Sequence, residues 1–366
     1  MKANESVKNY PSERRMYANY AARSIKKVCK EIGPRFSGTE QEKAGIDYMA
    51  EDMKTCCDVV GKDEYTVSPM AFLGWIPLSV ILMTVSSALF FAVALLSLPY
   101  QLLFISVALV AICLFFIVTE FVFYKETLDP FCKKKTSYNA YGYRKASGET
   151  KKRIILVGHA DSQFEWMLNY WLGGVGMKLV LIPAVVGLVA DLIIAIIGII
   201  CAGTNGALEA AEPRWLMILG FVVGCIFIPF QLGFLFFQSY TKSVPGANDN
   251  LSGCLGCMSV LKHLEEAGVR FENTEVRVIL SGSEEAGLRG AKAYAKAHKE
   301  ELKDVETIVI ACDTLRDLKD MAVYDRDLSG TLKHDKQVKQ LVKKAALNCG
   351  HDLPYASIYL GACDAA

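Results

Sequence analysis

The sequence predicts an α/β fold in which helices flank a mixed β-sheet and four transmembrane helices are inserted as two hairpins. Three observations predict it. Polar side chains follow the ends of several apolar strands, four long apolar runs interrupt the polar sequence, and hydrophobic residues make up 52% of the 366 residues. The mean hydropathy of +0.26 is high for a soluble enzyme, and the excess is concentrated in the four runs. It therefore indicates membrane spans rather than a large core.

Residues 1–70 are predicted to form the N-terminal part of the α/β domain. The first residues are polar and show no cleavable signal peptide. Apolar residues at helical spacing predict helix from Tyr17 to about Thr55, with a break at Gly33-Pro34. Asp58 to Val67 is expected to be an edge strand.

Four apolar runs are each long enough to cross a hydrocarbon core ~30 Å thick, which takes about 20 residues. They are Ala71–Leu96, Leu102–Tyr124, Met177–Ala202 and Trp215–Tyr240. They pair as two hairpins, in segments 71–124 and 176–240, with tips near Ser97–Gln101 and Gly203–Pro213. The sequence therefore predicts an integral, multi-pass membrane protein.

The distribution of charge predicts the orientation. Lys and Arg are frequent in residues 1–70 and 125–178, whereas the two tips carry none apart from Arg214, where the last span begins. By the positive-inside rule, the termini and the segments between the hairpins, including residues 125–175 and 241–366, are expected in the cytoplasm.

Three features near the spans each allow two interpretations. Asp191 lies near the middle of the third run and Glu120 near the inner end of the second. Carboxylates in membranes are often functional, but Asp191 is equally well explained by a polar contact between helices, and Glu120 by its reaching the interface. Four aromatic residues are expected at the headgroup level or along a substrate channel: Phe164, Trp166, Tyr170 and Trp171.

Chemistry-bearing side chains follow the predicted strands. An apolar strand ends in His159-Ala160-Asp161, Glu275–Ser281 is followed by Glu284-Glu285, and Thr307–Ala311 is followed by Asp313. Asp249 stands just before a predicted helix, Leu251–Ala267. Ligands of α/β sheets bind at the carboxyl ends of strands, and carboxylates with a histidine are ligands for divalent metals. A carboxylate at Asp161 could accept the second ring N–H of His159.

Each segment taken alone has a structural explanation as well. Asp249 could cap the following helix, and Glu284-Glu285 could be a solvated turn. The whole set, all at strand or helix ends, favours a metal site.

These motifs resemble the co-catalytic zinc aminopeptidases, peptidase family 28, which also contains glutaminyl cyclases and non-catalytic relatives. The resemblance covers about residues 15–70 and 136–366. It rests on His159-Ala160-Asp161, on residues 246–253 (Gly-Ala-Asn-Asp-Asn-Leu-Ser-Gly), on residues 284–290 (Glu-Glu-Ala-Gly-Leu-Arg-Gly) and on Asp313. It implies a zinc exopeptidase fold.

The resemblance also implies roles for single residues. His159 and Asp313 would bind one Zn2+, Glu285 would bind a second, and Asp249 would bridge the two ions. Asp161 would orient His159, and Glu284 would be the general base acting on the attacking water.

The family's second zinc also requires a C-terminal histidine, which this chain lacks. Gly361-Ala362-Cys363-Asp364 resembles the motif that accompanies it, but Ala365-Ala366 follow. None of the remaining histidines fits; these are His263, His298, His334 and His351. Either the chain is a C-terminally incomplete version of a longer protein, which we expect, or the second site is defective.

The rest of the sequence adds little about function. The formal net charge of +1 gives no case for nucleic-acid binding, and the scattered cysteines favour a reducing compartment. Cys254-x-x-Cys257 is expected to be helix packing. After Asp313, the pattern predicts strands at Met321–Tyr324 and Ala356–Leu360 around a lysine-rich helix, Lys333–Asn348.

The sequence thus predicts a membrane-anchored zinc exopeptidase, an aminopeptidase acting on peptides beside the lipid bilayer. Two alternatives stay open. One is glutaminyl cyclisation, which uses a single zinc, and the other is a non-catalytic membrane receptor or scaffold with the same fold.

Overall fold

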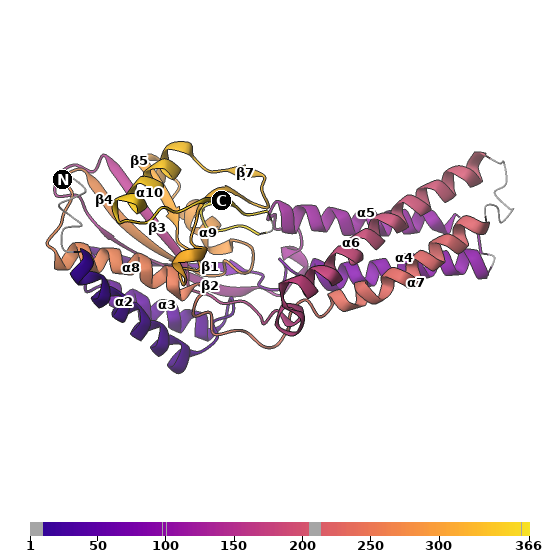
Figure 1. The fold of residues 1–366 in the computed structure, drawn as a ribbon, viewed down its shortest axis with the longest axis horizontal. Coiled ribbons are helices and arrows are strands. Elements are labelled where there is room, and N and C mark those ends of the chain that lie inside the picture. Colours follow the sequence, from indigo (N-terminus) through magenta and orange to yellow (C-terminus); the bar gives the residue numbers. More distant parts are fainter. Residues whose placement is uncertain (1–9, 97, 100, 205–213, 360) are drawn as a thin grey trace.

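A computed structural model describes residues 10–96, 98–99, 101–204, 214–359 and 361–366 (Figure 1). An α/β domain occupies one side of the molecule, and an elongated group of helices extends from it on the other (Figure 1). The predicted hairpin tips lie partly outside the described residues: Ser97 and Tyr100 in the first, and residues 205–213 in the second.

The α/β domain is built on a mixed five-stranded sheet with the order β1-β2-β4-β3-β5. The strands are β1 Val59–Val67, β2 Lys135–Arg144, β3 Lys152–His159, β4 Thr274–Ser281 and β5 Glu306–Ala311. β1 and β2 pair antiparallel, β2 and β4 also pair antiparallel, and β3 runs parallel to both β4 and β5. The mixed sheet and the edge position of β1 agree with the prediction.

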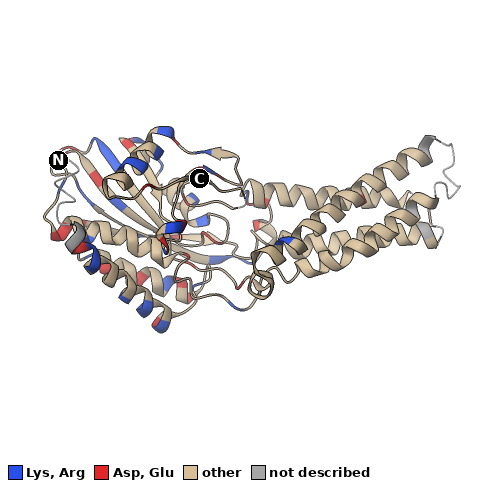
Figure 2. Cartoon of the chain, in the orientation of Figure 1, with Lys and Arg blue, Asp and Glu red and all other residues tan. Residues whose placement is uncertain are grey.

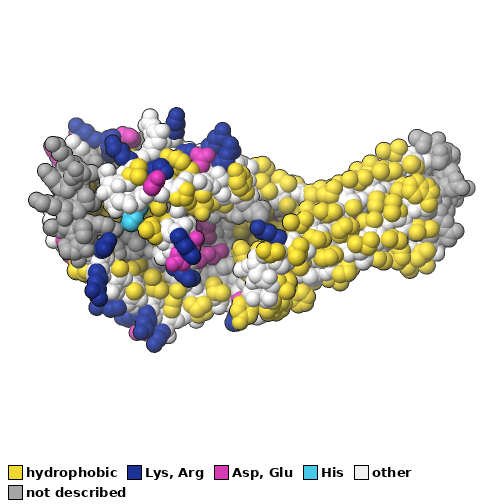
Figure 3. Space-filling view, in the orientation of Figure 1, with side chains coloured by type: hydrophobic (Ala, Val, Ile, Leu, Met, Phe, Trp, Pro, Cys, Tyr) yellow, Lys and Arg dark blue, Asp and Glu magenta, His cyan; other side chains and the backbone are white. Residues whose placement is uncertain are grey.

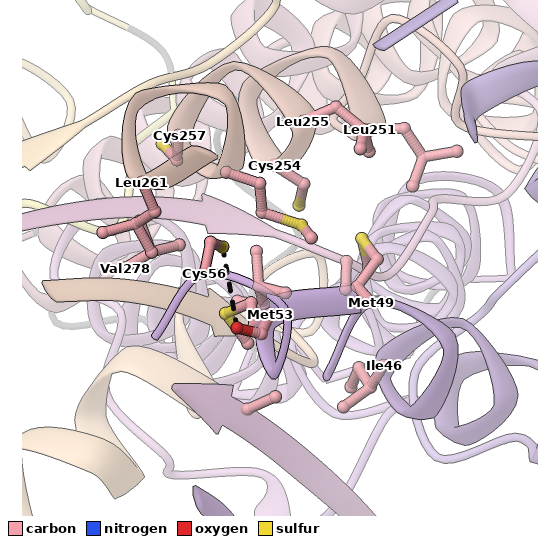
Figure 4. Close-up of a cluster of buried hydrophobic side chains, with 14 of the residues drawn as sticks. Ile46, Met49, Met53, Cys56, Leu251, Cys254, Leu255, Cys257, Leu261 and Val278 are labelled. Carbon is pink, nitrogen blue, oxygen red and sulfur yellow. Dashed lines mark hydrogen bonds between the residues drawn. The ribbon is translucent and has the colours of Figure 1, made fainter. Parts of the chain in front are cut away.

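Three helices cover one face of this sheet. They are α2 Tyr10–Lys27, which continues into a π-helical turn η1 Val28–Ile32, α3 Glu40–Met53 and α8 Leu251–Glu266. Successive side chains of a strand point to opposite faces, so Val276, Val278 and Leu280 of β4 all face these helices. The core between them includes sulfur-containing side chains of α3 and α8 (Figure 4). Cys254 and Cys257 are buried in this core, in agreement with the helix-packing role predicted for the Cys-x-x-Cys pair.

The opposite face of the sheet is covered by α9 Arg289–Ala297. Ile155 and Val157 of β3 pack with Ile279 of β4 and Tyr294 of α9 in a second cluster. Two short 3-10 turns follow in this region, η4 Glu301–Lys303 and η5 Leu318–Asp320.

A separate three-stranded sheet, with the order β7-β6-β8, closes the C-terminal part. Its strands are β6 Val323–Asp327, β7 Leu332–Lys333 and β8 Tyr355–Ser357, beside helix α10 Lys336–Asn348. The predicted strands at Met321–Tyr324 and Ala356–Leu360 are therefore shifted by one or more residues, and Leu360 lies outside the described residues. The helix begins at Lys336 rather than Lys333 because Asp335 caps it, accepting the N–H groups of Gln337 and Val338.

The elongated part consists of four apolar helical stretches. They are α4 Trp75–Leu95, α5 Leu102–Phe116 with its π-helical continuation η2 Ile117–Val122, α6 Met167–Thr204 and α7 Arg214–Phe234. Each hairpin packs on the other, through α4 against α7 and α5 against α6. Glycines allow close approach: a Cβ on Gly187 would lie 2.5 Å from Phe227, and one on Gly220 2.6 Å from Phe90. Small residues at helix contacts are typical of membrane bundles.

Among the described residues, three helices are long and apolar enough to cross a membrane: Trp75–Val93, Leu102–Val122 and Met167–Cys201. The fourth predicted span contains a shorter apolar helix, Ile218–Phe234. α6 begins at Met167, ten residues before the predicted Met177, because its bounds include a short first helix. A kink at Gly173, whose φ is 67°, separates this short helix from the long one. Four spans paired as hairpins remain a prediction.

The surface of the elongated part differs sharply from that of the α/β domain. Lysine, arginine and acidic residues gather on the α/β domain and are nearly absent from the drawn helices of the extension (Figure 2). The visible face of the extension is instead covered by apolar side chains (Figure 3). Ile81, Phe104 and Leu179 are 60%, 57% and 65% exposed, respectively. Such a surface is suited to lipid rather than water.

The two predicted intramembrane carboxylates are both buried. Asp191 accepts a hydrogen bond from Ser87 Oγ at 3.0 Å, which is the polar contact between helices that the sequence left open. Glu120 accepts hydrogen bonds from Thr127 Oγ1 and from the N–H of Leu128, each at 2.6 Å. Its second oxygen lies 3.7 Å from Arg289, which directly follows the turn containing Glu284 and Glu285.

Candidate metal and active site

Three parallel strands carry most of the predicted site residues to one edge of the sheet. His159 is the last residue of β3, Glu284 and Glu285 follow the end of β4, and Asp313 follows the end of β5. Because β3 is parallel to β4 and β5, these strand ends lie on the same side. The predicted convergence at the carboxyl ends of the strands is therefore present.

The loop before α8 brings Asp249 to the same place. The helix is capped by Asn250, whose Oδ1 accepts the N–H of Gly253 at 2.9 Å, and not by Asp249. The Asn250 side chain also donates to the carbonyl of Cys312 at 2.9 Å, which joins this loop to the loop of Asp313. A Cβ on Gly253 would lie 2.0 Å from that carbonyl oxygen, so only glycine permits the close approach.

The His159 ring is the centre of the cluster. Its Nε2 lies 3.1 Å from Asp249 Oδ1 and 3.8 Å from both Glu284 Oε2 and Asp313 Oδ2. Two sets of three potential ligand atoms lie within 4.8 Å of one another, His159 with Asp249 and Asp313, and His159 with Glu284 and Glu285. A nitrogen ligand surrounded by carboxylates suits a divalent transition metal such as zinc.

Asp161 is placed differently from the prediction in one respect. Its Oδ1 lies 3.4 Å from His159 Nδ1, and that nitrogen has no hydrogen-bond partner among the described residues. The carboxylate instead accepts the backbone N–H groups of Glu284 and Glu285, both at 3.1 Å, and the hydroxyl of Ser37 at 2.9 Å. Asp161 thus fixes the turn that carries the two glutamates.

Glu42, which sequence reasoning did not place in the site, supports the same turn from α3. Its buried carboxylate accepts the N–H of Ser283 at 2.8 Å, the hydroxyl of Ser137 at 3.0 Å and the N–H of Gly38 at 2.7 Å. Burial, with the nearby charge of Asp161, raises the pKa of Glu42 to about 8. The only sequence signal was its position three residues after the helix N-cap, Thr39.

Arg35 is a second residue without an assigned role in the sequence analysis. It is fully buried, and its guanidinium donates to the carbonyls of Ala160 at 2.7 Å and Pro245 at 2.8 Å. It also donates to the carbonyls of Gly33 at 3.1 Å and Gly246 at 3.2 Å. Arg35 therefore fastens the segment after His159 to the loop that leads to Asp249.

The C-terminal segment adds one more carboxylate. Asp364 accepts a hydrogen bond from Ser281 Oγ at the end of β4, and its other oxygen is buried without a partner among the described residues. Burial raises the pKa of Asp364 to about 6, while the charge of His159 opposes the shift. The motif at residues 361–364 was noted in the sequence, but this position beside the cluster was not predicted from it.

The remaining histidines that form ion pairs lie outside the cluster, as the sequence analysis expected. His263 pairs with Glu13 at 3.1 Å, and His298 pairs with Asp63 at 2.8 Å. His334 lies 3.3 Å from Asp327 in the small sheet.

The electrostatics of the cluster fit a bound cation. Burial raises the pKa of Glu284 and of Glu285 well above the ordinary value, and the neighbouring carboxylates add repulsion. Burial would lower the pKa of His159, but the surrounding carboxylates, Glu284 first, raise it well above its ordinary value. Buried groups that repel one another in this way are stabilised by a divalent cation, the largest positive charge such a site can receive. The donor set of one histidine and four carboxylates therefore fits a zinc ion, and so does the nearby Asp364 oxygen that has no partner among the described residues.

Comparison with known proteins agrees with the resemblance in the sequence. Residues 236–364 match the family model described as Peptidase family M28. This match agrees with the resemblance over a narrower range than the motifs suggested, and it supports the predicted enzyme class, a zinc metallopeptidase. No curated protein matches the chain.

Solved structures with a similar arrangement include zinc enzymes. A glutaminyl cyclase from Bacteroides thetaiotaomicron is 12% identical, with a TM-score of 0.47, and the alignment covers 93% of this chain and 76% of that one. A zinc aminopeptidase from Bacillus subtilis is 14% identical, with a TM-score of 0.47 and coverage of 92% and 79%. A Zn-dependent exopeptidase from Parabacteroides distasonis is 13% identical, with a TM-score of 0.48 and coverage of 95% and 77%. At these scores the likenesses carry no argument about activity.

Proposed function

The chain carries a region of peptidase family M28, residues 236–364, and from this premise we propose that it is a membrane-anchored zinc exopeptidase of the aminopeptidase type. The single observation that carries the proposal is the convergence of His159 with Asp249, Glu284, Glu285 and Asp313 at one edge of the sheet. Bound zinc would polarise the scissile carbonyl and lower the pKa of the attacking water.

The protein's own residues divide into ligands and a base. His159, Asp249 and Asp313 form one set of potential ligand atoms. Asp249 would also reach a second ion, which Glu285 would hold. Glu284 would be the general base: its side chain is only 11% exposed, and burial raises its pKa above the ordinary value, which makes the carboxylate a stronger proton acceptor. Asp161 and Glu42 hold the backbone of the turn, so that the two adjacent glutamates keep separate directions.

Membrane attachment is the second part of the proposal. The four apolar helical stretches span the bilayer as two hairpins, in segments 71–124 and 176–240, and the α/β domain formed by residues 1–70, 125–175 and 241–366 lies in the cytoplasm. The lipid-type surface of the extension and the clustering of basic residues on the α/β side support this arrangement (Figures 2 and 3). Because the second hairpin joins His159 to Asp249, the site lies near the membrane surface. The peptide substrate is therefore expected to be hydrolysed beside the bilayer.

The test is hydrolysis by the full chain reconstituted in lipid nanodiscs with zinc. Release of the N-terminal residue from a peptide is expected, and Glu284→Gln should lower kcat by ~10²–10⁴-fold while leaving the zinc content unchanged. Glu300→Gln, an exposed glutamate on the surface, is the matched control and should keep full activity. Undiminished activity of Glu284→Gln would remove Glu284 from its role.

A second candidate function, glutaminyl cyclisation, is favoured by one observation. Among the described residues the cluster contains a single histidine, which suits one zinc rather than two. A peptide with N-terminal glutamine separates the candidates in one experiment: hydrolysis releases free glutamine, whereas cyclisation releases ammonia and retains the residue. Mass spectrometry of the peptide distinguishes the two products.

A further inference from the structure

A cavity of about 210 Å³ lies beside Glu285, at the junction between the α/β domain and the membrane helices. Its walls come from five separate segments of the chain: the N-terminal loop, the region where α4 starts, the segment after β3, the segment after α7 and the turn after β4. The lining residues are Phe36, Pro69, Met70, Leu73, Gly74, Pro77, Gln163, Phe164, Gln238, Tyr240 and Glu285. The bases of both hairpins therefore form part of one pocket next to a predicted zinc ligand.

Most of the wall is apolar. The rings of Phe36 and Phe164 are stacked, with centroids 4.0 Å apart. Leu73, just before α4, and Pro77, in its first turn, add further apolar side chains to the lining. A concave site with an apolar lining and a few polar groups is the usual form of a ligand pocket.

Two polar groups of the lining have no partner within the described chain. Gln238 is 3% exposed and its Oε1 has no hydrogen bond, and the hydroxyl of Tyr240 is likewise buried and unpaired. A buried polar atom without a partner is unfavourable, so these atoms indicate a ligand that supplies one.

A third polar residue connects the pocket to the site. Gln163 donates to the backbone carbonyl and to a side-chain oxygen of Glu285, both at 3.1 Å, and accepts the N–H of Phe164 at 2.8 Å. The orientation of Glu285 and the position of an aromatic wall of the pocket thus depend on one amide side chain. An occupant of the pocket lies next to the predicted metal site.

We propose that this pocket binds a large apolar residue of the peptide substrate, with Gln238 and Tyr240 hydrogen-bonding to its polar atoms. The inference rests on the proposed peptidase function and names its substrate class: peptides with a large apolar residue beside the scissile bond. The membrane hairpins are then part of the specificity site as well as an anchor. An apolar pocket distinguishes two side chains that differ by one methylene by ~10–200-fold in kcat/KM. We therefore expect phenylalanine to be preferred over alanine by ~10-fold or more.

A lipid acyl chain is the rival occupant. An acyl chain would fill the apolar part but leave Gln238 Oε1 and the Tyr240 hydroxyl unpaired, because it has no donor or acceptor. The pocket also opens next to Glu285, where an acyl chain has nothing to bind. These observations favour a substrate residue.

The experiment measures binding and turnover separately in the full chain in nanodiscs. Binding of phenylalaninamide and alaninamide is measured by NMR without zinc and with zinc, and hydrolysis of peptides beginning with Phe or Ala is measured with zinc. Met70→Trp places a large ring in the lining and is expected to reduce the Phe-to-Ala ratio toward one in both assays. Met16→Trp makes the same change at a similarly exposed methionine on α2 and should leave the ratio as in the unmodified protein.

Gln238→Leu provides a second variant should Met70→Trp fail to fold. Loss of its acceptor is expected to weaken binding of phenylalaninamide by ~10-fold. A ratio near one in the unmodified protein, an unchanged ratio in Met70→Trp, or a pocket occupied by lipid that the amides do not displace would overturn the proposal. Preferential binding of phenylalaninamide without hydrolysis of either peptide would refute the peptidase function and leave the pocket assignment standing.

Discussion

Replacing Arg35 by methionine is expected to destabilise the α/β domain and lower its zinc content. The guanidinium is fully buried and donates to four backbone carbonyls in three segments, including those of Ala160 and Pro245. Methionine has similar length but no donors, so these carbonyls lose their partners. A Cβ on Gly45 of α3 would lie 2.6 Å from Arg35 Cδ, which indicates how closely the fold is built around this side chain.

The magnitude follows from the contacts. Each hydrogen bond from a charged donor contributes ~1.5–3 kcal/mol, which would give ~6 kcal/mol or more for four. Part of this is offset, because the variant no longer buries a charge that lacks a carboxylate partner. A net loss of about 2–4 kcal/mol remains, and this corresponds to a fall in Tm of ~5–15 °C for a domain of this size.

A thiol-reactive dye gives the readout as the rise in labelling above the level of the folded protein. Cys254 and Cys257 are buried in the core and become accessible on unfolding, whereas Cys225 is exposed and is labelled in the folded state. The matched control is Arg270→Met, which breaks a half-exposed ion pair with Asp58 and is expected to cost ~1 kcal/mol or less. Zinc per chain is measured on both variants by elemental analysis. An Arg35→Met protein with the Tm and zinc content of the control would refute the reasoning.

Three further predictions follow. Asp249→Asn removes a negative charge 3.1 Å from His159 Nε2 and should lower zinc content; unchanged zinc would count against its role as a ligand. The pKa of Glu42, raised from 4.5 to about 8, means that the folded state holds this proton more tightly than the unfolded chain. The free energy of unfolding should therefore fall as pH rises from about 4.5 to about 8. This dependence on pH should be weaker in Glu42→Gln. Equal slopes of Tm against pH in the two proteins would show that Glu42 does not cause the dependence. Gly253→Ala brings a Cβ to 2.0 Å from a backbone carbonyl oxygen and should lower the free energy of unfolding by ~1–3 kcal/mol. Gly256→Ala on the same helix is the control, because its Cβ meets only the flexible end of Leu315 at 3.1 Å. Similar Tm values for the two variants would contradict this prediction.

The sequence predicted the sheet and the cluster because both depend on local order along the chain. Apolar strands followed directly by His159 or Asp313 place these side chains at strand ends whatever the details of packing. Parallel pairing of β3 with its neighbours then brings the ends together. The small C-terminal sheet was predicted less well, since strands of two to five residues are defined mainly by their partners.

The supporting residues could not be predicted from local pattern. Glu42 meets Ser283 across 241 positions of sequence, and Arg35 meets Gly246 across 211. Such contacts depend on how α3 and the loops dock on the sheet, which no periodicity records. Capping was similarly ambiguous: Asp249 and Asn250 are both good N-cap residues, and the fold uses the second and leaves the first for the cluster.

In the proposed membrane-anchored peptidase, the ion pairs of Arg289 would connect the lipid environment to catalysis. This residue follows the turn of Glu284 and Glu285 and lies 2.6 Å from Asp129 and 3.7 Å from Glu120. Glu120 lies in η2, at the end of the second apolar helix, and Asp129 lies in the segment that follows. A thinner or thicker bilayer changes the tilt of a spanning helix. Such a tilt would act on the glutamate turn through Arg289 and also through Lys292, which donates to the carbonyl of Tyr124. Rates measured in short-chain and long-chain lipids are therefore expected to differ even at equal zinc and substrate concentrations.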